Sequence, residues 1–160
     1  MKNIFFSIIF LLSMFVAGAQ NKTANSLTYK SAFGAKIWNG GGLTLKTFIN
    51  PKHALEFTGF FRGLGSRVGA SYEIHGDLNS EGNLKWYFGP GVHVGFYKFD
   101  EGALQKYNGT YVGVNGVVGI DYKFTELPIN ISLDWQPAFE FFSGNNGFVN
   151  FGGLSVRYTF

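Results

Sequence analysis

The chain has 160 residues, which is enough for one domain of ordinary size. It carries 13 Lys and Arg against 10 Asp and Glu, a formal net charge of +3, with no basic run, so nucleic acid is not an expected partner. The absence of Cys excludes disulfide bonds, thiol catalysis and lipidation at an N-terminal Cys.

The first 19 residues have the pattern of a secretory signal peptide. Lys2 precedes an apolar run from residue 4 to residue 16, and Ala17, Gly18 and Ala19 are the small residues that a signal peptidase needs. An N-terminal membrane anchor is the alternative, but the run is shorter than the roughly 20 apolar residues of a spanning helix. We predict a signal peptide over residues 1–19 and a polar leader over residues 20–30.

From residue 31 onward, apolar and polar residues alternate with a period of two, which indicates β-strands. Segments rich in Gly, Asn and Pro divide this region into eight expected strands. The strands cover residues 31–39, 42–50, 54–64, 66–76, 84–99, 109–124, 129–142 and 148–160.

The alternation is clearest in residues 129–142, where Leu133 and Trp135 share one face and Ser132 and Asp134 the other. In a soluble sandwich the apolar face would form the core. The strand at 109–124 is too long for a typical sandwich, and aromatic residues gather near the strand ends, as they do at two membrane interfaces. We therefore predict an all-β fold, an eight-stranded antiparallel up-and-down transmembrane β-barrel over residues 31–160.

The polar strand faces predict a charged lumen. An eight-stranded barrel leaves room for side chains rather than for a water channel, so these charges are expected to form ion pairs. A gated ion path or a proton relay is the alternative. The residues expected in this lumen charge network are Lys36, Lys46, Glu56, Arg62, Arg67, Glu73, Lys85, Asp121, Lys123, Asp134, Glu140 and Arg157.

No catalytic, cofactor-binding or metal-binding residue is predicted. His75 and His93 fall on the inward face, but no Ser or Cys nucleophile shares a motif with them, and the spacing is not that of metal ligands. Pro90 and Pro137 fall in phase with the outward apolar positions. Because a proline cannot donate to a strand ladder, each is expected to mark a bulge or a missing hydrogen bond, either as a local kink or as a lateral gap for a lipid chain.

The fifth and sixth strands are the longest and predict a protruding hairpin. About 16 residues span roughly 53 Å, which projects about 40 Å when tilted, against an apolar band about 25 Å tall. The loop between them holds Glu101, Leu104, Lys106 and Tyr107, the candidate partner-binding residues. The alternative is that the hairpin only stands among lipopolysaccharide sugars.

The last strand, GLSVRYTF, places Leu154, Val156, Tyr158 and Phe160 on one face and ends on an aromatic residue. This is the pattern of a closing strand that serves as an assembly signal. Together with GGGLTLKTFINPKHALE, LKWYFGPGVHVGFY and GVVGIDYKFTELPINISLDWQPAFE, it resembles the small outer-membrane β-barrel proteins common in Bacteroidota. The architecture is similar, more loosely, to OmpX and the OmpA membrane domain.

This resemblance implies a location in the Gram-negative outer membrane and assembly by the barrel assembly machinery. We expect a non-enzymatic structural or interaction component of the envelope, in contact with outer-membrane lipid and lipopolysaccharide and with a possible envelope protein partner. The alternatives are a lipid A acyl-modifying enzyme, which would need a His with a Ser at the outer rim, and a narrow passive pore.

Overall fold

The computed structural model describes residues 29–62, 65–100, 106–142 and 145–160, without the side chains of 62, 97–100, 106–108, 142 and 145–146. The predicted signal peptide and the predicted leader up to residue 28 lie outside this part. Within the described ranges there is no helix with the length and apolar character to cross a membrane.

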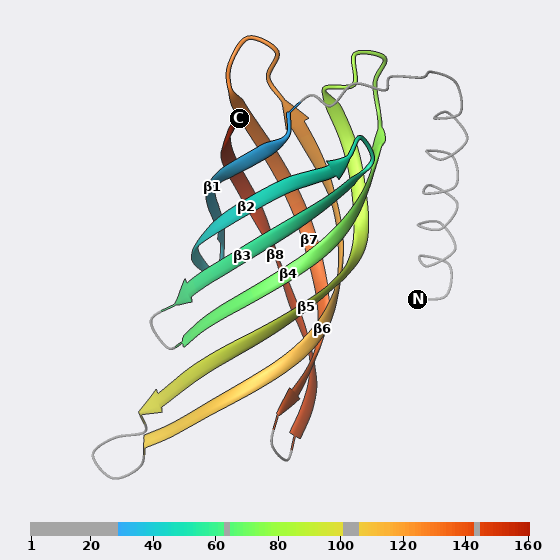
Figure 1. The fold of residues 1–160 in the computed structure, drawn as a ribbon. Helices are drawn as coiled ribbons and strands as arrows, with labels where there is room; N and C mark the ends of the chain where they lie inside the picture. Colours follow the sequence, from blue (N-terminus) through green and yellow to red (C-terminus); the bar gives the residue numbers. More distant parts are fainter. Residues whose placement is uncertain (1–28, 63–64, 101–105, 143–144) are drawn as a thin grey trace, which may run out of the picture.

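The described residues form one closed antiparallel barrel in which each strand pairs with its sequence neighbours (Figure 1). The predicted fold class is therefore confirmed, and the predicted strand ends agree within a few residues. The strands are β1 (Ser31–Trp38), β2 (Gly40–Asn50), β3 (His53–Arg62), β4 (Gly65–Asp77), β5 (Leu84–Asp100), β6 (Lys106–Lys123), β7 (Ile129–Phe142) and β8 (Asn145–Thr159).

Pairing of β1 with β8 closes the barrel. Ala32 lies opposite Thr159, and Gly34 lies opposite Arg157. A Cβ atom at Gly34 would lie 2.0 Å from a carbonyl oxygen of β8. The absence of a side chain therefore allows the first and last strands to approach closely enough to pair.

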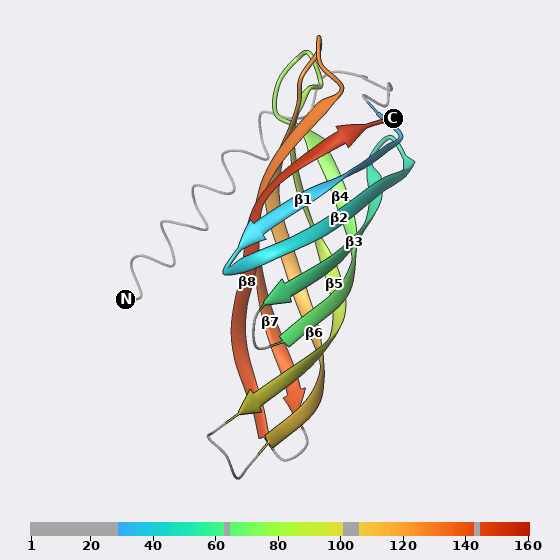
Figure 2. The same cartoon turned by 90° about the vertical axis from the view of Figure 1, so that its left-hand side faces the viewer.

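The two ends of the barrel differ in height (Figures 1 and 2). At the terminal end, where β1 begins and β8 ends, the strands finish at a similar level. At the opposite end, which we call the far end, β1 to β4 stop early and β5 to β8 continue. The pairing of β1 with β8 stops at Ile37 and Leu154, so among the described residues the segment Asn145–Gly153 of β8 pairs with β7 only.

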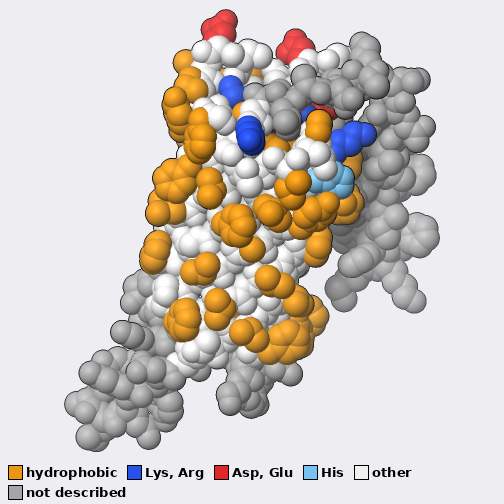
Figure 3. Space-filling model, viewed as in Figure 1, with side chains coloured by type: hydrophobic (Ala, Val, Ile, Leu, Met, Phe, Trp, Pro, Cys, Tyr) orange, Lys and Arg blue, Asp and Glu red, His pale blue; other side chains and the backbone are white. Residues whose placement is uncertain are grey.

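The side-chain pattern is the reverse of that in a soluble protein. Large apolar side chains point outward along the strands, including Phe33, Phe57, Val92 and Leu133, which are each 45–58% exposed. Figure 3 shows hydrophobic side chains covering this face of the wall and charged side chains gathered near the terminal end. The inward face is polar, because the strand period of two separates the two kinds of side chain.

Neither outward proline shifts the register of its strand, although pairing is interrupted beside Pro90 between β4 and β5 and beside Pro137 between β6 and β7. On either side of Pro90, Ser71 lies opposite Gly91 and Ile74 opposite Phe88, which is one continuous register. The β7–β8 register likewise runs unbroken through Pro137. A missing hydrogen bond in the strand ladder therefore fits the geometry at both prolines better than a bulge. The register shift that the structure does contain lies elsewhere, in the β2–β3 pair between Phe48 and Asn50.

Candidate functional site

The lumen is filled by a buried ion-pair network centred on Arg157 of β8, which is 1% exposed. Its guanidinium pairs with the carboxylate of Glu56 on β3. It also donates to Thr44 (3.2 Å), Asn130 (3.1 Å) and Ser132 (2.7 Å). The guanidinium N–H groups of Arg157 thus donate to side chains on three other strands. This one residue therefore links β8 to β2, β3 and β7.

Lys36 of β1 extends the network toward β7. Its Nζ lies 2.6 Å from Oδ2 of Asp134 and 3.5 Å from Oε1 of Glu56. Asp134 also accepts hydrogen bonds from the Tyr87 hydroxyl (3.0 Å) and the Gln136 amide (3.0 Å). The buried carboxylate is therefore compensated by one cation and two neutral donors, which is what a charge in a narrow interior requires.

Lys46 of β2 carries the network toward β4 and β6. Its Nζ lies 2.8 Å from Glu73 and 3.3 Å from Asp121, and it sits 3.9 Å from the ring centroid of Tyr87. Asp121 also accepts a hydrogen bond from the side chain of Asn130, whose amide oxygen accepts one from Arg157. The clusters around the three cations are consequently joined into one connected plug that crosses the lumen.

The last two residues of the predicted polar leader, Tyr29 and Lys30, are held by the barrel. Tyr29 is buried at the terminal end, where its hydroxyl donates to Asp121 (3.1 Å) and its ring packs edge-on against Phe48 (centroids 5.1 Å apart). Burial, and then the nearby carboxylate, raises the pKa of Tyr29 well above its ordinary value, so the hydroxyl stays a donor. The carbonyl of Lys30 accepts from Phe48 N–H (2.8 Å), which fixes this segment to β2.

The inward histidines contact carboxylates and an amide. His75 Nε2 lies 3.0 Å from Glu73, while His93 contacts Asn115 through Nδ1 (3.1 Å) and Glu140 through Nε2 (3.4 Å). Neither ring hydrogen-bonds to a Ser in the described part of the chain. The same residues contain no group of three or more His, Asp or Glu side chains that could hold a metal ion.

Several residues assigned to the network from sequence lie apart from the central plug. Lys85 pairs with Asp77 near the terminal end. Lys123 donates to two carbonyl oxygens of the β6–β7 turn (2.5 and 2.8 Å), so it closes that turn instead of joining the plug. The side chain of Arg62 lies outside the described part.

The structure describes the predicted assembly signal but not the predicted partner-binding loop. Leu154, Val156, Tyr158 and Phe160 point outward and are 41–66% exposed, on the wall where β8 meets β1 and β7. Their role in assembly stays a prediction. The tip of the β5–β6 hairpin is not fully covered by the structure. Glu101 and Leu104 lie outside the described residues, and only the backbone of Lys106 and Tyr107 is described.

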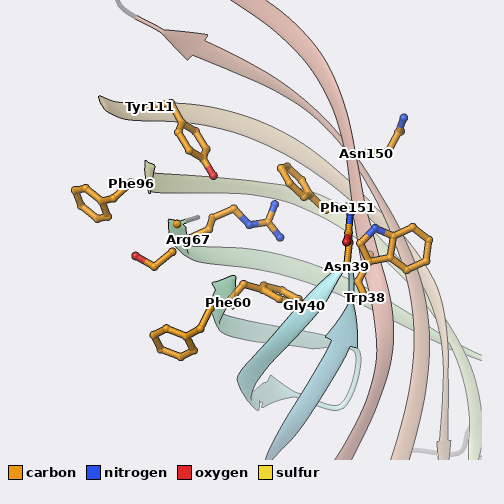
Figure 4. A pocket seen from close by; sticks show the side chains of 13 residues that line it. Trp38, Asn39, Gly40, Phe60, Arg67, Phe96, Tyr111, Asn150 and Phe151 are labelled. Atoms are coloured by element: carbon orange, nitrogen blue, oxygen red, sulfur yellow. The ribbon is translucent and has the colours of Figure 1, made fainter. Parts of the chain in front are cut away.

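A cavity of about 350 Å³ lies at the far end, where the short strands stop (Figure 4). Arg67 of β4 points into it and is only 7% exposed. Its guanidinium carbon lies 3.4 Å from the ring centroid of Phe151 and 5.1 Å from that of Phe60. Trp38 and Tyr111 line the same space. Sequence reasoning placed Arg67 in the lumen but did not bring it together with these rings.

The charge network predicted from the sequence contained charged residues only, so it left out the neutral members of the plug, although Asn130, Ser132 and Gln136 fall on the polar face assigned to the lumen. The signal was present, because each is a polar or phenolic residue in inward phase on a strand that also carries an inward charge. These residues are Thr44, Tyr87, Asn130, Ser132 and Gln136.

Comparison with known proteins identifies the fold. The chain is similar to the crystal structure of the N-terminal β-barrel domain of Pseudomonas aeruginosa OprF, with a TM-score of 0.57 and 16% sequence identity. The match covers 81% of this chain and 94% of the OprF domain. The two chains share a barrel fold. No family model matches the sequence, and no curated protein matches it.

Proposed function

We propose that this chain is an integral outer-membrane β-barrel protein of a Gram-negative envelope. In this proposal it performs no chemical reaction, and it acts as a structural or interaction component. The observation that carries the proposal is the inside-out distribution of side chains. Charged residues such as Lys36, Lys46 and Glu56 are at most 1% exposed inside, while Phe61 and Tyr158 are at least 60% exposed outside. Only a lipid surround makes the outer wall favourable.

Membrane residence is tested by fractionation and heat modifiability. The full-length chain is expressed in a Gram-negative host, membranes are separated on a density gradient, and the protein is run on SDS gels with and without boiling. We expect it in the outer-membrane fraction, with a faster band before boiling, because a closed barrel stays compact in detergent. A soluble periplasmic protein with a single band would refute the proposal. The N-terminal sequence of the recovered protein tests the predicted cleavage after Ala19.

The filled lumen supports a closed barrel over a passive pore. Lys36, Lys46 and Arg157 reach carboxylates on facing strands, so the plug crosses the interior instead of lining it. Eight strands enclose little more than their own side chains. We expect no stable conductance from the purified protein in planar bilayers. A sizeable, reproducible single-channel conductance would replace this proposal with the pore.

The interaction role is assigned to the β5–β6 hairpin, which extends beyond the shorter strands at the far end (Figure 1). β5 has 17 residues and β6 has 18, against 8 in β1. Protruding paired strands offer an accessible surface to a partner. The test is an affinity-tagged pull-down from outer membranes in mild detergent, comparing the wild-type chain with a deletion of residues 101–107.

A stoichiometric envelope protein that is lost in the deletion would support the interaction role. A clean monomer in both samples would leave a structural barrel without this partner. The matched control is a deletion of Asn145 and Asn146, the first residues of β8, which shortens the far end of a different hairpin. Assembly by the barrel assembly machinery, guided by Leu154 to Phe160, belongs to the same proposal.

A further inference from the structure

The three buried cations of the plug, Lys36, Lys46 and Arg157, each lie within ion-pair distance of a carboxylate. Arg67 differs. No Asp or Glu oxygen in the described part lies within 4.0 Å of its guanidinium nitrogens. The carboxylates of Glu140 and Asp134 face the same lumen and attract Arg67, but neither reaches ion-pair distance of its guanidinium. A buried guanidinium without an anion in direct contact is only partly compensated, so Arg67 requires explanation.

The aromatic contacts of Arg67 involve the flat faces of its guanidinium and not its N–H edges. The guanidinium lies against the ring of Phe151 and within cation–π distance of Phe60. Such contacts use the flat face of the group. They leave its in-plane N–H donors available, and Figure 4 shows the guanidinium directed into the space that Phe60, Tyr111 and Phe151 line. A planar edge of several donors matches the two oxygens of a carboxylate or phosphate.

The shape of the cavity points to a ligand with a body as well as a charge. Its volume of about 350 Å³ is larger than an inorganic anion needs and falls at the lower end of small-molecule sites. Phe60, Phe151 and Trp38 supply apolar walls. Gly152 and Gly40 add no side chains to the lining, which keeps the space open.

We infer that the far-end cavity is a binding site for an oxyanion carried on an apolar or aromatic body, with Arg67 as its receptor. The carboxylate or phosphate accepts from the guanidinium edge, while the body packs against Phe60 and Phe151. The orientation of the site at the cell surface rests on the proposed function. Two sources could supply such a group: a soluble aromatic acid or phosphate ester, and a phosphate of outer-leaflet lipopolysaccharide.

The test uses the arginine side chains as reporters. The chain contains three Arg, at positions 62, 67 and 157, so arginine-selective ¹⁵N labelling gives few Nε–Hε signals. Phenyl phosphate is titrated into the folded full-length mature barrel, with inorganic phosphate as the probe that lacks a body. We expect saturable movement of the Arg67 signal, half-saturation at about tenfold lower concentration for phenyl phosphate, and a stationary Arg157 signal.

Variants separate recognition from charge alone. R67K keeps the cation and loses the fork, so calorimetric titration with phenyl phosphate should show binding about tenfold weaker. F151L keeps an apolar wall and loses the ring, which should weaken binding less. No Arg67 movement at millimolar probe, equal movement of Arg157, or unchanged affinity in R67K would each overturn the site.

The source of the anion is decided in nanodiscs. If lipopolysaccharide nanodiscs move the Arg67 signal without added probe and block phenyl phosphate, the ligand is the lipid phosphate. If phenyl phosphate binds equally in lipopolysaccharide and phospholipid nanodiscs, the ligand is soluble. A silent Arg67 in a barrel that is folded in the nanodisc refutes this site and leaves the outer-membrane proposal standing. Failure to reach the outer membrane refutes that proposal instead.

Discussion

Removing the cation at the centre of the plug should be among the most damaging single changes in the lumen. Arg157→Met keeps much of the apolar volume of the side chain but removes the guanidinium that faces Glu56. Breaking a buried ion pair by removing one partner costs about 3–5 kcal/mol, since the other charge is left uncompensated. Glu56 still accepts from Thr44 (2.6 Å) and lies 3.5 Å from Lys36, so we expect the lower figure.

A loss of about 3 kcal/mol raises the unfolded-to-folded ratio about 10²-fold. The measurement is urea unfolding of the barrel in lipid vesicles, followed by tryptophan fluorescence. The matched control is Arg67→Met, which also removes a buried guanidinium but leaves no paired carboxylate behind. Because Arg67 contacts rings, we expect its loss to cost about 1 kcal/mol.

The double variant Arg157→Met with Glu56→Gln gives the decisive comparison. Removing the orphaned charge should restore part of the stability lost in the single variant, because contacting residues in one network are not additive. Equal destabilisation by the Arg157 and Arg67 variants, or a double variant that simply sums its parts, would show that the plug contributes packing and not charge compensation.

Other positions test the barrel seam, its terminal end and its assembly. Gly34→Ala should prevent formation of the heat-modifiable band, since its Cβ would lie 2.0 Å from a β8 carbonyl, whereas Gly59→Ala, with nothing within 4 Å, should fold normally on the same gel. Tyr29→Phe should lower the free energy of unfolding by about 1.5–3 kcal/mol through the lost hydrogen bond to Asp121, measured in urea. Phe160→Ala should slow membrane insertion without changing unfolding of the assembled barrel, as followed by pulse-chase; normal insertion would dismiss the C-terminal aromatic as an assembly signal.

The barrel could be predicted because its signal is local. A strand alternates faces whatever its neighbours are, so Leu133 and Asp134 already separate the wall from the lumen in the sequence. Strand number followed from turn residues in the same way. The inward direction of Lys36, Lys46 and Arg157 is a consequence of phase alone.

Partners in the lumen could not be predicted because they depend on the stagger between strands. Lys36 meets Asp134, which lies 98 residues away, and no local pattern encodes that pairing. The Arg67 cavity has the same origin. Arg67 and Phe151 come together where β1 to β4 end and the far-end part of β8, Asn145–Gly153, continues beyond β1.

The unequal strand lengths also determine how much of the bilayer thickness each side of the barrel spans. With a rise of about 3.3 Å and a tilt of about 40°, the 8 residues of β1 span only about 20 Å of membrane normal, whereas the 18 residues of β6 span about 45 Å. An apolar band about 25 Å tall fits within β6 and exceeds β1. If the barrel lies in the outer membrane as proposed, lipid beside β1 must thin to avoid mismatch. The protein would then give its surrounding bilayer a thickness gradient from one side to the other.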